Sequence, residues 1–162
     1  MWSLSGARRL PAQHLDRLYI GAFAAPTQSG REKAMTHERF ARLADDAVAR
    51  IPQIFRDAMR NIAIIIDDLP GPEVLEHLGV KPPDTLFGLY EGIPLPERQW
   101  DHGNVLPDRI FLFREPIEEA SETDDEVVAT IGETLIHEVG HYFGLSEEEI
   151  ENIEEHHWRQ RA

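Results

Sequence analysis

The feature that most restricts the fold is a long helical pattern near the C-terminus, over residues 124–143. Apolar residues recur along it at the three- and four-residue spacings that place them on one side of a helix. They are Val127, Val128, Ile131, Leu135 and Ile136. Gly144 follows, and glycine commonly ends a helix because it adopts the left-handed conformation without strain. We therefore expect one long helix here, backed by a small sheet.

The second half of this helix carries the sequence HEVGHYFGLSE, from His137 to Glu147. His137 and His141 are four residues apart, so both imidazole rings lie on one helix face and can bind one ion. Glu138 lies about a third of a turn further round. It can reach a water molecule on that ion without binding the ion itself.

The third protein ligand is expected beyond the helix, because the next helical turn would point away from the ion. Gly144 permits a sharp turn that brings Glu147 back under the metal. The pattern thus predicts one Zn²⁺ ion held by His137, His141 and Glu147, with one coordination position open for water. Glu138 is then the candidate catalytic residue, acting as the general base.

Composition limits the other classes of function. The 162 residues include no cysteine, so any metal must be held by His, Asp or Glu, and a cytoplasmic protein is expected. The net charge of -14 argues against nucleic acid as a partner. The longest purely apolar run, Ile62 to Ile66, is far too short to cross a bilayer, so no membrane partner is expected.

Residues 1–34 differ from the rest of the chain. Arg8 and Arg9 precede a short apolar patch that loosely resembles a signal peptide, but the patch lies beside Asp16 and Arg17. We expect residues 1–34 to be a mobile N-terminal extension, and Met35 is a candidate for the natural start of the protein. Residues 35–162 are expected to form a single domain.

Further helices are expected on both sides of the strands. Thr36 can cap a helix whose apolar residues continue to residue 51, and Pro52 can begin a second helix. Near the C-terminus, Ser146 and Glu149 match a capping box at the start of a last helix.

Three strands are expected between these helices. Residues 61–68, 85–92 and 109–114 are short apolar runs bounded by turn residues, and a short helix is expected near residues 73–77. The proline-rich residues 93–108 predict a long loop that can cover the active site. The order of helices, strands and helices predicts an α+β domain, with a small mixed sheet of three to four strands packed on helices.

Three segments together resemble the minimal zincin-like metallopeptidase family of small bacterial proteins. They are LYEGIPLPER (89–98), LPDRIFLFREPI (106–117) and the HEVGHYFGL helix. The resemblance covers residues 35–153 and implies a compact core, a single zinc ion and peptidase activity.

The sequence also departs from a related pattern. Full-size metzincins have a third histidine where this chain has Glu147, and a methionine turn downstream. The methionines here all lie upstream, at Met1, Met35 and Met59. A carboxylate ligand reduces the net charge at zinc, so weaker activation of water is expected.

Alternatives remain for the third ligand. Glu148 and Glu151 lie near Glu147, but only Glu147 has the spacing that matches a turn after the helix. His156 and His157 lie at the far end of the last helix and are expected to be solvated.

Other polar residues have a structural and a functional interpretation. Tyr90 and His102 are candidates to stabilise an oxyanion, although a packed aromatic ring and a loop histidine are the commoner roles. Arg109 and Arg114 are expected to form ion pairs with the many acids rather than to bind substrate. Glu133 could accept the second ring proton of the first histidine, but solvent exposure is expected. The aromatic and aliphatic residues of the last two strands are assigned to the core: Phe87, Leu89, Phe111 and Phe113.

The sequence therefore predicts a zinc-dependent hydrolase, a metallopeptidase that acts on a peptide or protein substrate. The alternative is a non-catalytic module, stabilised by zinc, that binds a peptide or protein. A bacterial endoribonuclease family has a related motif with glycine in place of the glutamate, and Glu138 argues against it.

Overall fold

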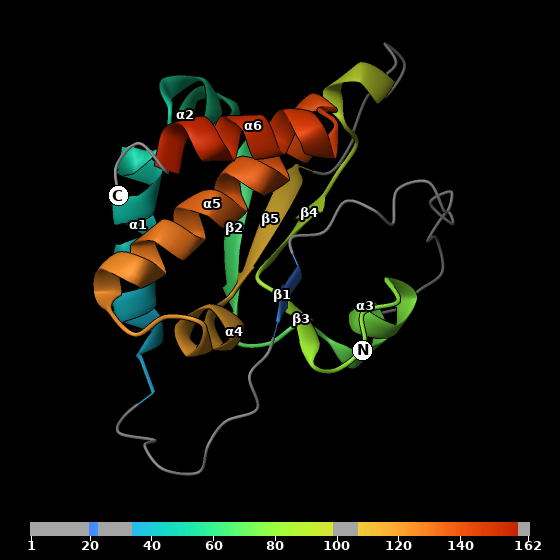
Figure 1. Cartoon of the computed structure of the whole chain (residues 1–162). Coiled ribbons are helices and arrows are strands. Elements are labelled where there is room, and N and C mark those ends of the chain that lie inside the picture. The colour runs from blue at the N-terminus through green and yellow to red at the C-terminus, as the bar shows by residue number, and fades with distance from the viewer. Residues whose placement is uncertain (1–19, 23–33, 99–106, 159–162) are drawn as a thin grey trace.

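The computed structural model describes residues 20–22, 34–98 and 107–158. This part of the chain contains both helices and strands (Figure 1). The elements are β1 (Ile20–Ala22), α1 (His37–Arg50), α2 (Gln53–Met59), β2 (Ile62–Asp67), α3 (Pro72–His77), β3 (Asp84–Leu86), β4 (Gly88–Glu91), η2 (Leu95–Glu97), β5 (Asp108–Phe113), α4 (Arg114–Glu119), α5 (Asp124–Phe143) and α6 (Glu147–Trp158).

The main sheet has three strands in the order β2-β5-β4. Strand β5 pairs in parallel with β2, from Ile62 opposite Asp108 onward, and antiparallel with β4, from Gly88 opposite Leu112 onward. β4 is thus an edge strand among the described residues. Helix α5 lies across one face of this sheet, with α1 at its N-terminal half and α6 at its C-terminal half (Figure 1). The expected α+β class with a small mixed sheet is confirmed.

The single strand predicted over residues 85–92 is wrong, because the chain changes partner at Phe87. Residues before Phe87 form β3, which pairs antiparallel with β1 in a separate two-stranded sheet. Residues after it form β4, which pairs with β5. The carbonyl of Phe87 still accepts a hydrogen bond from the backbone N–H of Phe113 at 2.9 Å.

Residues 20–22 belong to the segment predicted as a mobile extension, yet they form β1. Of the other residues of that segment, only residue 34 lies in the described part of the chain. The domain boundary at residue 35 therefore stays a prediction.

The predicted helices occur close to their expected limits. Thr36 caps α1 by accepting a hydrogen bond from the N–H of Arg39 at 3.2 Å. Thr123 and Glu126 form a capping box at the start of α5. Helix α4 was not predicted: Arg114, expected to end a strand, is instead its first residue.

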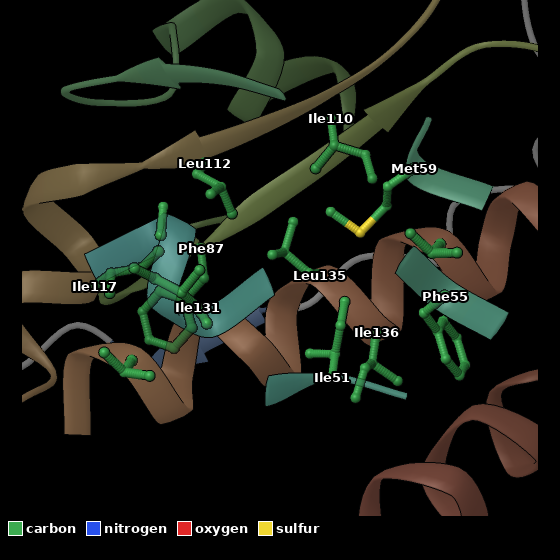
Figure 2. Close-up of a cluster of buried hydrophobic side chains, with 14 of the residues drawn as sticks. Ile51, Phe55, Met59, Phe87, Ile110, Leu112, Ile117, Ile131, Leu135 and Ile136 are labelled. Carbon is green, nitrogen blue, oxygen red and sulfur yellow. The ribbon is translucent and has the colours of Figure 1, made fainter. Parts of the chain in front are cut away.

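The core lies between the sheet and α5 (Figure 2). Ile131, Leu135 and Ile136 of α5 are fully buried, as are Ile110 and Leu112 of β5. Phe87 and Phe113 are buried as expected, whereas Leu89 and Phe111 are only partly buried.

The C-terminal half of α5 is more enclosed than a one-sided apolar pattern predicts. Every residue from Thr134 to Tyr142 is buried. The sheet, α1, α2 and α6 all contact this helix. No helix in the described part of the chain is both long and apolar enough to cross a membrane.

Candidate metal centre

The turn between α5 and α6 reverses the chain within three residues. Gly144 has φ 74°, a left-handed conformation that strains other residues. Its N–H donates to the carbonyl of His141 at 3.0 Å, and the N–H of Leu145 donates to the carbonyl of Gly140 at 3.0 Å. Glu147 therefore begins the next helix directly beside the end of α5.

A capping box starts α6, as the sequence predicted. The N–H of Ser146 donates to Glu149 Oε2 at 2.8 Å, and the N–H of Glu149 donates to Ser146 Oγ at 3.3 Å. The Glu149 carboxylate accepts hydrogen bonds from the backbone N–H of Ser146 and from its Oγ–H, the latter at 3.0 Å, and these two bonds lower the pKa of Glu149. They also define the first turn of α6, which contains Glu147.

Gly140 allows α6 to approach α5 closely. A Cβ atom built at this position would lie 2.6 Å from Ile150 Cγ1, closer than real atoms pack. Ile150 is fully buried at this crossing. The contact holds the start of α6 next to the helical turns that carry the two histidines.

Three potential ligand atoms converge at this crossing. Glu147 Oε2 lies 3.5 Å from His137 Nε2, and Glu147 Oε1 lies 3.8 Å from His141 Nε2. One ligand atom from each residue lies within 4.8 Å of the others. Ligands about 2.0–2.2 Å from a tetrahedral Zn²⁺ ion lie roughly 3.3–3.6 Å apart, so small adjustments suffice to bind it. The residue types and their spacing fit zinc.

Burial differs among these three side chains. His137 and His141 are buried, whereas 37% of the Glu147 side chain is exposed. The centre therefore lies at the edge of the core, where Glu147 is the most exposed of the three residues. Such a position suits a site that must admit a substrate.

Glu138 is fully buried and is bound by the sheet. Its Oε2 atom accepts a hydrogen bond from the backbone N–H of Tyr90 at 2.7 Å. In the antiparallel pairing of β4 with β5, this N–H lies on the edge that faces away from β5. A strand far from α5 in the sequence thus fixes the orientation of the Glu138 carboxylate.

Glu154 is a second acidic neighbour of His137 that was not predicted. Its Oε1 atom lies 3.3 Å from His137 Nδ1. Burial, the largest effect on the His137 pKa, lowers it, but the hydrogen bond to Glu154 and the charges of Glu138, Glu154 and Glu147 together raise it. A signal existed in the sequence, because Glu154 follows Glu147 by seven residues, about two helical turns.

The structure separates the alternative ligands from this group. Glu148 and Glu151 are exposed and lie outside the three-residue group. His156 is exposed, as expected. His157 is partly buried, and its Nε2 atom donates to the carbonyl of Arg50 at 3.0 Å, so it joins α6 to the end of α1.

The two arginines form ion pairs, as the sequence analysis favoured. Arg109 pairs with Glu91 at 2.8 Å. Arg114 is buried and pairs with Asp68 at 2.8 Å and with Glu118 at 2.9 Å. Both side chains support the fold through these contacts.

The hydroxyl group of Tyr90 lies close to the side chains of Asp108 and Arg98. Burial and the charge of Asp108 raise the pKa of its hydroxyl, and a hydrogen bond with Arg98 opposes them. Arg98 also pairs with Asp108 and lies over the ring of Tyr142, 5.2 Å from its centroid. The first part of the predicted loop is thus attached beside the end of α5.

The two remaining candidates from the sequence are His102 and Glu133. His102, considered for an oxyanion role, lies outside the described residues. Glu133, considered as the acceptor for His137, is half-buried on α5, and the carboxylate 3.3 Å from the Nδ1 atom is that of Glu154.

Comparison with known protein families gives a match to the zincin-like metallopeptidases over residues 59–158. This chain belongs to that family. The region matched in this zincin-like metallopeptidase contains the three-stranded sheet, α5 and α6, whereas α1 precedes it. A search of curated proteins found no match.

Membership in the zincin-like metallopeptidase family implies a zinc-dependent peptidase type of function. The group of His137, His141 and Glu147 is consistent with the zinc binding that the family implies. The roles of the individual residues stay predictions.

Proposed function

We propose that this protein is a zinc-dependent peptidase in which His137, His141 and Glu147 bind one zinc ion. The convergence of their ligand atoms within 4.8 Å, beside a buried glutamate, is the observation that carries this proposal. Zinc bound there would polarise a substrate carbonyl and lower the pKa of a water molecule. Two imidazoles and one carboxylate leave the open position that catalytic zinc sites retain.

Glu138 is the general base in this proposal. It follows the first ligand directly, and its charge contributes to the raised pKa of His137. The hydrogen bond from Tyr90 orients its carboxylate, which can take a proton from water and return it to the leaving amine. A positioned carboxylate of this kind contributes about 10²–10⁴-fold to the rate of hydrolysis.

An extended peptide is the substrate that this arrangement favours. β4 is an edge strand of the described sheet, and it lies beside the helix that carries Glu138. A peptide can add to such an edge through hydrogen bonds to the outward-facing backbone groups of β4 other than the Tyr90 N–H, which donates to Glu138. This mode would place a peptide bond of the substrate close to the proposed base.

Glu138→Gln tests the proposal. Glutamine preserves the shape of the side chain, and its amide oxygen can still accept the hydrogen bond from Tyr90. We expect the variant to bind one zinc ion per chain, like the wild type, and to lose about 10²–10⁴-fold in peptide cleavage. Elemental analysis measures the zinc content, and mass spectrometry of a peptide library measures cleavage.

Two further variants serve as controls. Glu148→Gln removes the same charge at an exposed position of α6 and should preserve zinc and cleavage. His137→Ala should lose both. If Glu138→Gln cleaves as fast as the wild type, its role as base is wrong. If the wild type binds zinc and cleaves nothing, the non-catalytic peptide-binding module replaces the peptidase.

A further inference from the structure

The two ring nitrogens of His137, on α5, face two acidic residues of α6. Nε2 lies 3.5 Å from Glu147 Oε2, and Nδ1 lies 3.3 Å from Glu154 Oε1. His137 is buried, and the Glu154 side chain is only 19% exposed. The histidine is therefore enclosed between its proposed metal position and a second carboxylate.

The geometry of α6 explains how one helix supplies both acids. Seven residues separate Glu147 from Glu154, so the two side chains project from nearly the same helix face. The helix is held along its length by the capping box at Ser146, the buried Ile150 and the bond from His157 to the α1 carbonyl. Glu154 thus projects from a fixed part of the fold.

The chemistry of imidazole gives this contact a consequence for metal binding. A neutral ring has one N–H and one lone pair, and the metal takes the nitrogen that carries the lone pair. A carboxylate at Nδ1 accepts the N–H, keeps the proton there and limits rotation of the ring. The lone pair of Nε2 is then directed at the metal, and the basicity of the ligand rises.

We propose that Glu154 is a positioning residue of the metal centre, which accepts the Nδ1–H of His137 and presents Nε2 to zinc. This inference rests on the proposed function, because it assumes that His137 is a zinc ligand. Glu154 does not touch the reacting atoms. Its contribution is measured in zinc affinity.

Glu154→Ala is the variant that tests this role. We expect zinc affinity to fall about 10–100-fold, the usual effect of losing a partner of a metal-bound histidine. Competition with a chromophoric zinc chelator measures the affinity. Glu151→Ala is the matched control, because it removes the same charge from an exposed position on the same helix. Its affinity should stay within about 3-fold of the wild type.

Glu154→Gln separates the hydrogen bond from the charge. The amide oxygen can accept the same Nδ1–H, so we expect its affinity to lie between those of the wild type and Glu154→Ala. Thermal unfolding in excess chelator should remain cooperative for all variants, which would show that each variant still folds. The absorption spectrum of the Co²⁺-loaded protein should change in Glu154→Ala and not in Glu151→Ala, because it reports on ligand geometry.

The outcomes distinguish this inference from the proposed function. If the wild type binds no zinc, the proposed function fails first. If the wild type binds zinc and Glu154→Ala binds it as tightly as Glu151→Ala, only the positioning role is overturned. Equal weakening in Glu154→Gln and Glu154→Ala also overturns it, because charge alone would then explain the effect.

Discussion

At the scale of single residues, the position of Glu147 decides whether the two histidines form a metal site. Its two carboxylate oxygens face different rings, at 3.5 Å from His137 Nε2 and 3.8 Å from His141 Nε2. Two histidines on one helix bind an ion weakly when no third ligand completes the set. Neither Glu148 nor Glu151 belongs to the group.

We therefore predict that Glu147→Ala weakens zinc binding by more than about 100-fold. The expected loss exceeds the upper end found for outer partners of a ligand, because a direct ligand disappears. Glu148→Ala should bind zinc as the wild type does. Chelator competition on the three proteins measures the difference, and a strong loss in Glu148→Ala would move the ligand assignment to that residue.

At the scale of elements, the proposed metal centre depends on how closely α6 packs on α5. Gly140 lies between His137 and His141 in the sequence of α5. It is buried under Ile150 of α6. Glycine within a helix costs about 1 kcal/mol relative to alanine, so local helix propensity does not favour it here. Close packing of the two helices is the physical reason that a residue without a side chain fits this position.

Gly140→Ala tests this packing. The added methyl group would lie 2.6 Å from Ile150 Cγ1 and 2.7 Å from its Cδ1 atom. Overpacking costs about 1–3 kcal/mol, which the gain in helix propensity offsets in part. We expect a net loss of up to about 2 kcal/mol in unfolding free energy, together with weaker zinc binding, because α6 must shift.

Urea unfolding in chelator and zinc competition measure the two effects separately. Adding Ile150→Ala to Gly140→Ala removes both close atoms, Cγ1 and Cδ1, and should restore part of the zinc affinity. Unchanged affinity in Gly140→Ala would show that the centre tolerates a displaced α6.

At the scale of the whole molecule, the proposed centre connects the middle of the fold to its C-terminal helix. α5 contacts the sheet, α1 and α2, whereas α6 contributes Glu147 and packs on α5 from outside. An ion that binds both helices binds the folded chain in preference to the unfolded chain. Zinc should therefore stabilise the entire fold by mass action.

We predict that removal of zinc lowers the melting temperature of the wild type. Free zinc at 100 times its dissociation constant adds about 2.7 kcal/mol, which corresponds to roughly 5–10 °C for a chain of this size. Differential scanning calorimetry with zinc and with chelator measures this shift. His137→Ala should melt at the same temperature in both conditions, and an equal shift in that variant would place the stabilising zinc elsewhere.

The family and the main elements follow from local patterns in the sequence. The four-residue spacing places the two histidines on one helix face. Thr123 and Gly144 cap the two ends of α5. The start of α6 follows from the capping box of Ser146 and Glu149. All of these depend on neighbours within one or two turns, so a single sequence contains the necessary information.

Only the tertiary structure determined what surrounds the metal centre. The change of partner at Phe87, the hydrogen bond from Tyr90 to Glu138 and the contact of Glu154 with His137 join residues of different elements. Such contacts depend on how helices and strands pack, which no local pattern encodes. The sequence by itself thus determined which residues are candidates to bind zinc and to act as a base, and packing decided which neighbours hold them in place.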